Sequence, residues 1–158
     1  MMAIHPYERR WIQFSLALLV IFGLAVAGST LLFGIHLPGT GHHPLAEAAA
    51  AGYDPEEAWI REIGPGHYEV NLHAHAFYFD PGQIEIPAGA TVTFNVHSAD
   101  VIHGFKIIDT NVSLMAIPGQ VARVTHTFAQ PGEYLFVCTE YCGTGHHVMH
   151  GKVLVKSS

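Results

Sequence analysis

Four side chains suited to binding soft metals lie close together near the C-terminal end of the sequence. Two cysteines, a histidine and a methionine fall within twelve residues: Cys138, Cys142, His146 and Met149. Thiolate and thioether sulfur beside an imidazole favours copper over hard divalent ions. Two thiolates at this spacing also allow both sulfurs to bridge two metal ions. The pattern therefore suggests an electron-transfer centre rather than a structural zinc site.

Three simpler explanations of the two cysteines each leave a residue without a role. A disulfide is the default in an oxidising compartment, but it does not account for His146 and Met149. A structural zinc site normally has a second, distant pair of cysteine ligands, and this chain has 2 cysteines in all. A mononuclear blue-copper site uses one cysteine with two histidines and a weak methionine, so one thiol would be left over.

A copper centre needs a second imidazole from outside this run, and thirteen histidines compete for the role. His103 is the best candidate, because it lies on an expected strand beside Gly104. The absence of a side chain at Gly104 allows the backbone and the metal to approach closely. Asp100, three residues before the histidine, is placed to anchor this segment by a hydrogen bond behind the ligand.

The N-terminal region has the composition of a membrane anchor. Residues 11–37 contain no Asp, Glu, Lys or Arg, and a spanning helix needs about 20 such residues. A cleaved signal peptide is the alternative, but this run exceeds the roughly 7–15 apolar residues of a signal peptide. Arg9 and Arg10 precede the run, and no basic residue follows before Arg61. The positive-inside rule thus predicts a cytoplasmic N-terminus and a domain on the outer side of the plasma membrane.

The rest of the chain divides into a linker and a β domain. Residues 38–65 are expected to form the linker, with a short helix that begins at Asp54 and ends before Gly64. From residue 66 to residue 158 the apolar residues alternate with a period of two, which indicates strands separated by Pro-Gly turns. We expect strands at 68–72, 84–86, 92–96, 101–108, 121–128, 134–137 and 151–156. Short strands at this spacing predict a mainly β domain, either an antiparallel sandwich or a Greek-key barrel.

The part of the chain after the anchor is acidic. Residues 38–158 contain 12 Asp and Glu but 5 Lys and Arg. A nucleic-acid partner is therefore not expected, because phosphate binding requires the opposite charge. A basic soluble protein is a suitable partner through electrostatic steering, although the excess charge also serves solubility.

The candidate ligands resemble those of cytochrome c oxidase subunit II, which carries the dinuclear copper centre called CuA. Their order and spacing are His103-x34-Cys138-x3-Cys142-x3-His146-x2-Met149. The resemblance extends over nearly the whole chain and implies one transmembrane helix followed by a cupredoxin-like domain. The single anchor and the segments 100–105 and 131–134 are similar to those of B-type oxidases. The tryptophan-rich stretch of A-type subunits is replaced by Ala74–Phe79.

The same resemblance implies a role for each ligand. Cys138 and Cys142 would bridge two copper ions, and His103 and His146 would each bind one of them. Met149 would be the weak axial ligand of one copper ion. The backbone carbonyl of Glu140 would be that of the other. Spacing from Cys142 selects His146 rather than His147, and His150 is set aside for the same reason.

The function implied by the resemblance is electron entry into a terminal respiratory oxidase. A soluble cytochrome c or cupredoxin would reduce the copper centre, which would pass electrons to haem in the catalytic subunit I, where oxygen is reduced. His75, Phe77 and Tyr78 are candidates for the donor-facing surface, or else for the core of the sandwich. Two alternatives stay open: the CuA subunit of a nitric-oxide reductase, and a membrane-tethered copper chaperone.

Overall fold

The computed structural model describes residues 5–33, 41–50, 53–54 and 57–157, and the chain divides into two compact units, 1–36 and 37–158. The first unit is a single helix, α1 (Pro6–Phe33). Residues Pro6–Leu32 are long and apolar enough to cross a membrane. None of that span is buried within the protein, so its apolar side chains are available to lipid. The last four residues of the expected anchor, 34–37, lie outside the described part of the chain.

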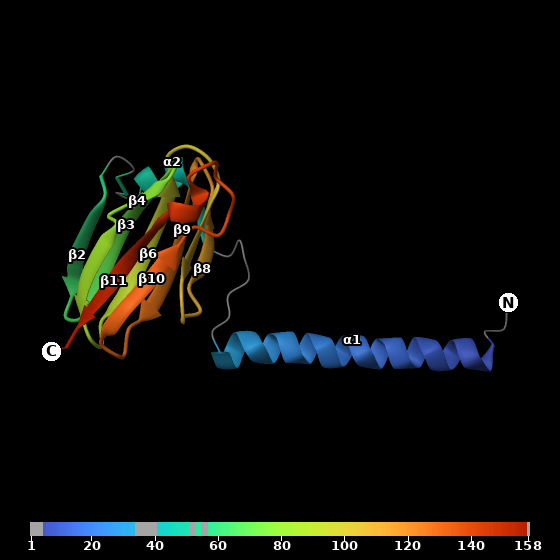
Figure 1. Ribbon diagram of the computed structural model, residues 1–158. Coiled ribbons are helices and arrows are strands. Elements are labelled where there is room, and N and C mark those ends of the chain that lie inside the picture. Colours follow the sequence, from blue (N-terminus) through green and yellow to red (C-terminus); the bar gives the residue numbers. More distant parts are fainter. Residues whose placement is uncertain (1–4, 34–40, 51–52, 55–56, 158) are drawn as a thin grey trace. The chain divides into compact units, whose positions relative to one another are not determined.

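The second unit is a sandwich of two β-sheets (Figure 1). Its elements in chain order are β1 (His42–Pro44), α2 (Leu45–Ala50), β2 (Trp59–Gly64), β3 (His67–His75), β4 (Tyr78–Asp80), β5 (Gln83–Pro87), β6 (Thr91–Ser98), β7 (His103–Ile107), β8 (Ser113–Ala116), β9 (Gln120–Thr127), β10 (Gly132–Val137), the short 3₁₀-helix η1 (His146–Val148) and β11 (His150–Lys156). All seven strands expected from the sequence are present. The strands β1, β2, β4 and β8 were not expected.

The two sheets are mixed rather than antiparallel. One sheet has the order β1-β9-β6-β3-β2 with β4 also paired to β3, and the other has the order β5-β11-β10-β7-β8. Strand β3 runs parallel to β6, and β5 runs parallel to β11. The expectation of an antiparallel sandwich is therefore wrong for these two pairs. Local alternation cannot reveal it, because parallel and antiparallel strands both have a period of two.

The core between the sheets is apolar and rich in phenylalanine. The ring of Phe105 on β7 lies 5.8, 5.6 and 5.3 Å from the rings of Phe79, Phe94 and Phe136. His103 lies two residues from Phe105 on the same strand, and both side chains are fully buried. Alternation places them on the same face, so the imidazole continues the aromatic core toward one end of the sandwich.

The expected helix beginning at Asp54 is wrong. Residues Trp59–Gly64 form β2, which pairs antiparallel with β3 from Trp59 opposite Asn71 onward. Arg61 stacks on Trp59 at 3.8 Å and forms a 3.0 Å ion pair with Glu69 on β3. Cross-strand contacts therefore outweigh the local capping signals. Residues 55 and 56, which were part of that signal, lie outside the described part of the chain.

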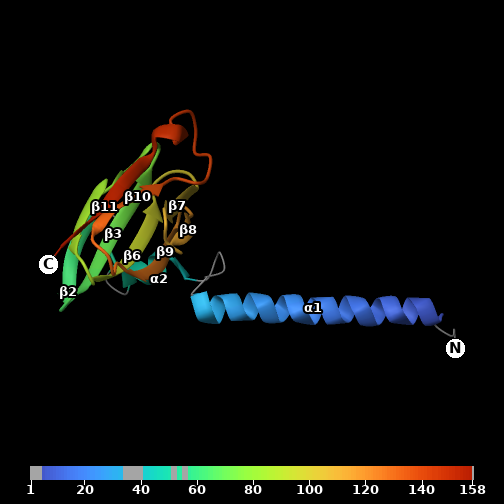
Figure 2. The same ribbon diagram turned by 60° about the horizontal axis from the view of Figure 1, so that its bottom comes forward.

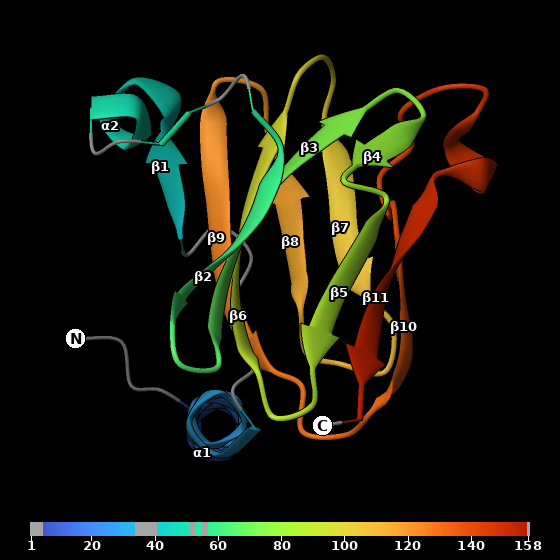
Figure 3. The same cartoon turned by 90° about the vertical axis from the view of Figure 1, so that its left-hand side faces the viewer.

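The expected linker also contributes to the sandwich. Strand β1 pairs with β9, His42 opposite Ala122, and α2 follows it directly (Figure 3). The ring of His42 is held by a 2.8 Å hydrogen bond to the carbonyl of Met115. The limits 1–37, 38–65 and 66–158 stay a prediction for the domain organisation.

Candidate metal centre

One loop carries four of the five candidate ligand side chains. It connects β10 to β11, whose last and first residues, Val137 and His150, are directly paired. A hydrogen bond of 3.1 Å from the amide of Cys138 to the carbonyl of Met149 closes the base of the loop. Figure 2 shows this loop, with η1 in it, projecting from the end of the sandwich. The loop is thus a hairpin connection fixed at both ends.

The fifth candidate, His103, reaches the loop from β7. The strands β7 and β10 are neighbours in the same sheet, with Val137 opposite Lys106. Nδ1 of His103 lies 3.8 Å from Sγ of Cys138. The potential ligand atoms of His103, Cys138 and Cys142 all lie within 4.8 Å of one another. The structure therefore brings together residues that are 35 positions apart in the sequence.

Asp100 fixes the orientation of His103, as the sequence suggested. Its Oδ1 lies 2.7 Å from Nε2 of His103. Because Nε2–H donates to this carboxylate, the lone pair of Nδ1 faces the cysteine sulfur. Burial alone would raise the pKa of Asp100, but hydrogen bonds from His103 and from the amides of Ala76 and Val101 outweigh it, and the pKa is lowered. The carboxylate is thus held in its charged form.

The other candidates surround Cys142. Its Sγ lies 3.7 Å from Nδ1 of His146 and 3.7 Å from Sδ of Met149. Met149 is buried, whereas His146 is half-buried with its ring edge-on to Tyr141. On the other side of the cluster, the backbone carbonyl of Glu140 accepts a 3.2 Å hydrogen bond from the thiol of Cys138.

Three glycines allow the close packing of this site. A Cβ on Gly104 would lie 2.0 Å from Oγ1 of Thr139 and 2.9 Å from its amide nitrogen. Only a residue without a side chain therefore leaves room here for the ligand loop, the connection between β10 and β11. On the opposite side, a Cβ on Gly143 or Gly145 would lie 2.8 or 2.4 Å from the ring of Phe77. Phe77 therefore supports the loop directly, a role that the sequence did not reveal.

Both cysteines are free thiols, which does not support the disulfide alternative. Burial raises the pKa of the Cys142 thiol, and the neighbouring Cys138 raises it further. The Cys142 thiol is therefore protonated near neutral pH, and metal binding there must release its proton.

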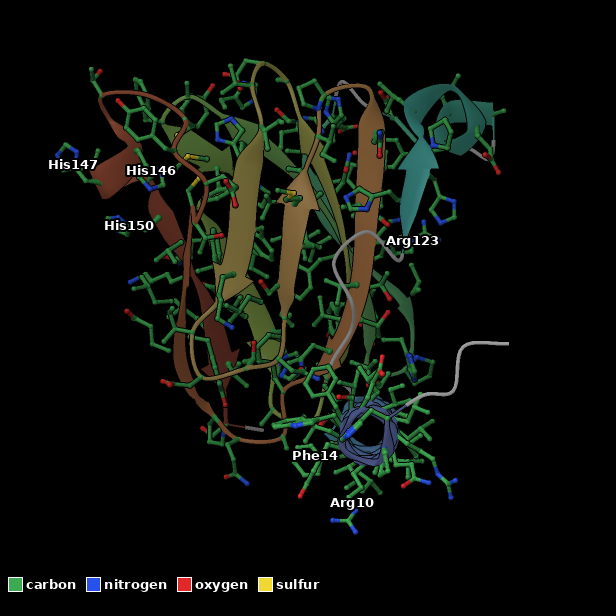
Figure 4. The ribbon with its side chains drawn as sticks, turned by 90° about the vertical axis from the view of Figure 1, so that its right-hand side faces the viewer. Arg10, Phe14, Arg123, His146, His147 and His150 are labelled. Atoms are coloured by element: carbon green, nitrogen blue, oxygen red, sulfur yellow. The ribbon has the colours of Figure 1, made fainter. Side chains whose placement is uncertain are left out.

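The histidines that spacing set aside lie on the surface of the same loop. His147 and His150 are exposed and lie on the same side of the domain as His146 (Figure 4). The Nδ1 of His150 is 2.9 Å from the carbonyl oxygen of Val148, which places it in a hydrogen bond away from the sulfur cluster. Neither imidazole is among the contacts of the two cysteines described above.

The three residues proposed for the donor-facing surface have different surroundings. Tyr78 is exposed, and its ring stacks on that of His75 at 4.8 Å. Phe77 is partly buried against the core cluster and under the loop. His75 and Phe77 flank Ala76 in the sequence, and the amide of Ala76 donates to Asp100 at 2.7 Å.

The set of donor atoms fits copper. It comprises two thiol sulfurs, two imidazole nitrogens and a thioether, which are ligands that soft or borderline first-row metals prefer. Nε2 of His103 hydrogen-bonds to Asp100, as the nitrogen of a metal-binding histidine that faces away from the metal usually does with a carboxylate or a carbonyl.

Comparison with known proteins agrees with this chemistry. Residues 73–157 match the family described as cytochrome c oxidase subunit II, periplasmic domain. A cytochrome c oxidase subunit 2 of Thermus thermophilus is 37% identical over 159 residues, covering 98% of this chain and 94% of the relative. A second protein of that name from Thermus thermophilus is 45% identical over 103 residues, covering 65% of this chain and 76% of the relative.

Solved structures give the same picture. A chain of a haem-copper terminal oxidase dimer, determined by cryo-electron microscopy, aligns with a TM-score of 0.79 and 33% identity. The alignment covers 95% of this chain and 99% of that chain. The periplasmic domain of subunit II of cytochrome oxidase from Bradyrhizobium japonicum shares the cupredoxin-like fold, with a TM-score of 0.53 at 20% identity over 65% of this chain and 87% of that one.

Proposed function

The chain belongs to the cytochrome c oxidase subunit II family, and on that premise we propose that it relays electrons from a soluble donor to the haem of the catalytic subunit. The family implies copper as the metal, and the assembly to which such subunits contribute is an oxidoreductase. The observation that carries the proposal is the cluster of His103, Cys138 and Cys142, whose potential ligand atoms lie within 4.8 Å of one another.

We assign six residues to a dinuclear copper centre. The thiolates of Cys138 and Cys142, the imidazoles of His103 and His146, the thioether of Met149 and the backbone carbonyl of Glu140 would hold the copper and tune it for one-electron transfer. The contacts that support this assignment are those of 3.2 to 3.8 Å between each sulfur and its neighbours. Bound there, two copper ions supply one-electron transfer with the charge shared over both metals and both sulfurs.

The protein contributes rigidity to this transfer. Asp100 holds the His103 ring, Phe77 supports the loop at its glycines, and β10 and β11 fix its two ends. Ligands held in one geometry move little between the two oxidation states, so the reorganisation cost of each electron transfer is small. Cys138 and Met149 are themselves buried, which adds to the rigidity of the loop.

The surface around the loop suits a protein donor. Exposed apolar side chains flank the ligands on both sides, namely Val101, Ile102, Tyr141 and Val148. Apolar side chains on an otherwise acidic domain provide a dry contact for a small redox protein, such as cytochrome c or a cupredoxin, steered by charge. The stacked rings of His75 and Tyr78 lie beside the segment that hydrogen-bonds to Asp100 and extend this surface.

The membrane topology follows from the charges next to the helix. Arg9 and Arg10 lie at the start of α1, and no basic residue follows in the sequence before Arg61. We therefore place the N-terminus in the cytoplasm and the copper domain outside the plasma membrane, where a soluble donor reaches it.

Electron paramagnetic resonance of the copper-loaded chain in detergent tests the proposal. We expect two copper ions per chain and a seven-line hyperfine pattern, because one unpaired electron is shared by two copper nuclei. A four-line signal from one copper ion would contradict the relay and favour the chaperone alternative. The Cys142→Ser variant should lose the seven-line pattern, while Tyr141→Phe, a change beside it that keeps the ring, should retain it.

A second measurement identifies the acceptor. The purified complex, supplied with reduced cytochrome c or a reduced cupredoxin, should consume oxygen. Consumption of nitric oxide without oxygen uptake would favour the nitric-oxide reductase alternative.

A further inference from the structure

The two exposed histidines of the ligand loop border an opening to the metal centre. A cavity of about 330 Å³ is lined by His147 and His150 together with Leu135 and Val137. Cys138, His146 and Met149 line the same cavity. Its lining therefore joins two surface histidines to Cys138 and Met149, residues that are only 7% and 2% exposed.

Three other sides of the site are tightly packed. Thr139 packs on Gly104 so tightly that a Cβ there would lie 2.0 Å from its hydroxyl. Phe77 seals the side of Gly143 and Gly145. Behind His103, the carboxylate of Asp100 occupies Nε2 at 2.7 Å. A metal ion arriving from solvent can therefore enter by the cavity beside His147 and His150, which leads to the buried Cys138 and Met149, while Cys142 is itself partly exposed.

The lining of this cavity suits the passage of a soft cation. It contains no lysine or arginine, so nothing in it repels positive charge at close range. Imidazole nitrogen is a good ligand for copper but a less soft one than thiolate sulfur. Donors therefore become softer from the rim of the cavity to its floor, and an ion gains affinity as it moves inward.

We propose that His147 and His150 form a transient copper-entry site, which receives copper(I) at the surface and passes it to Cys138 and Met149 along this cavity. This inference rests on the proposed copper centre. The transfer is a ligand exchange without a change of oxidation state. Each copper–imidazole bond is replaced by a copper–sulfur bond, and each thiol that becomes a ligand releases its proton to water.

Loading kinetics test the entry site. The metal-free full chain in detergent is mixed with copper(I) under anaerobic conditions, and formation of copper–thiolate bonds is followed by ultraviolet absorption. We expect the His147→Gln/His150→Gln variant to load about tenfold more slowly than the unaltered chain. His67→Gln is the matched control, because this exposed histidine lies at the far end of β3 from the site, and it should load at the normal rate.

A second variant separates the route from the imidazoles. Leu135 lines the cavity and is 41% exposed, so Leu135→Trp narrows the passage without removing a nitrogen ligand. We expect slower loading here too. Both variants should reach the same final copper content and the same mixed-valence spectrum after oxidation. An unchanged loading rate in both variants overturns the entry site, as does a lower final copper content in the histidine variant, which would make these residues permanent ligands.

The same data distinguish this failure from failure of the proposed function. If the unaltered chain does not take up two copper ions with the seven-line spectrum, the dinuclear centre is wrong. If it does so but the variants load at its rate, the centre stands and the entry site is wrong.

Discussion

Asp100 and His103 form a 2.7 Å hydrogen bond that points the free nitrogen of the imidazole at Cys138. The imidazole is fully buried, whereas the side chain of Asp100 is 36% exposed. The carboxylate thus connects a ligand in the core to the surface, where it also accepts the amide of Ala76. The contact fixes which ring nitrogen faces the cysteine sulfur.

Replacing Asp100 by Asn should weaken copper binding. The neutral amide removes the charge that orients the ring and raises its basicity, so we expect about 10–100-fold lower copper affinity with an unchanged fold. Competition titration with a copper chelator measures the change, and circular dichroism monitors the fold. Asp109→Asn, a neutralisation of an exposed turn residue, is the control. Equal affinities in the two variants would refute the positioning role.

Gly104→Ala should disturb both stability and the site. The new Cβ would lie 2.9 and 3.0 Å from the amide nitrogens of Thr139 and Glu140, which cannot rotate away. Overpacking of this kind costs about 1–3 kcal/mol. Urea unfolding of the full chain measures the cost. Gly64→Ala, where no atom lies within 4 Å of the added Cβ, should have a much smaller effect. Adding Thr139→Ala should restore part of the loss, because it removes the nearest side-chain contact.

The apparent affinity for copper should increase as the pH rises. The raised pKa of Cys142 means that protons compete with the metal at neutral pH and below. Binding through Cys142 releases the proton of this thiol, so the apparent copper affinity should rise about tenfold per pH unit below the pKa of Cys142. Titrations at several pH values, with a pH indicator to count protons, measure this. A copper affinity that does not change between about pH 6 and 8, where free thiols stay mostly protonated, would contradict this prediction.

The stability of the metal-free protein should fall, rather than rise, as the pH increases. Because the folded state holds the Cys142 proton more tightly than the unfolded state, the folded state binds more protons above the unfolded thiol pKa of about 8.5. The free energy of unfolding should therefore be greatest below that pH and decline as the pH rises above it. Thermal unfolding of the metal-free chain across this range, with Cys142→Ser as control, measures the decline.

Glu69→Gln should lower the free energy of unfolding and make that free energy less sensitive to acidic pH. Burial alone would raise the pKa of Glu69, but hydrogen bonds from Asn95 and Arg61 and the charges of Arg61 and Arg123 lower it. The stabilisation that Glu69 provides is fully present above the pKa that its carboxyl group has in the unfolded state. It is lost as the pH falls through the lowered pKa of the folded state. At neutral pH we expect a loss of about 1 kcal/mol. Glu133→Gln, an exposed partner of Lys152, should have less effect. Urea unfolding at neutral and acidic pH provides the comparison.

The sequence was sufficient to predict most strands and the clustering of the candidate ligands, because both depend largely on local patterns. Alternation gave all seven expected strands, and the spacing of Cys138, Cys142 and Met149 already indicated that their sulfurs meet. His103 was more distant, yet its strand, Gly104 and Asp100 were all identifiable. The structure places each of them in contact with the ligand loop or with its neighbour.

The features that were missed depend on pairing between distant segments. The helix expected at Asp54 followed from good capping residues, but Trp59–Gly64 lies beside β3 and pairs with it in antiparallel register, with one irregularity between Glu62 and Gly64. Strand β1 likewise exists through its pairing with β9. The role of Phe77 could not be read from its own segment, since its ring fills the space left by two glycines that are 66 and 68 residues away in the numbering.

The hairpin that joins β10 to β11 has a consequence for how such centres change over evolutionary time. Its ends, Val137 and His150, are neighbours in one sheet, so insertions or substitutions between them leave the strand register intact. Five of the six proposed ligands therefore lie in one short segment, which the scaffold contacts mainly through Phe77, Gly104 and His103. A lineage can revise its redox chemistry by altering a dozen contiguous codons while the sandwich, and the helix before it, stay as they are.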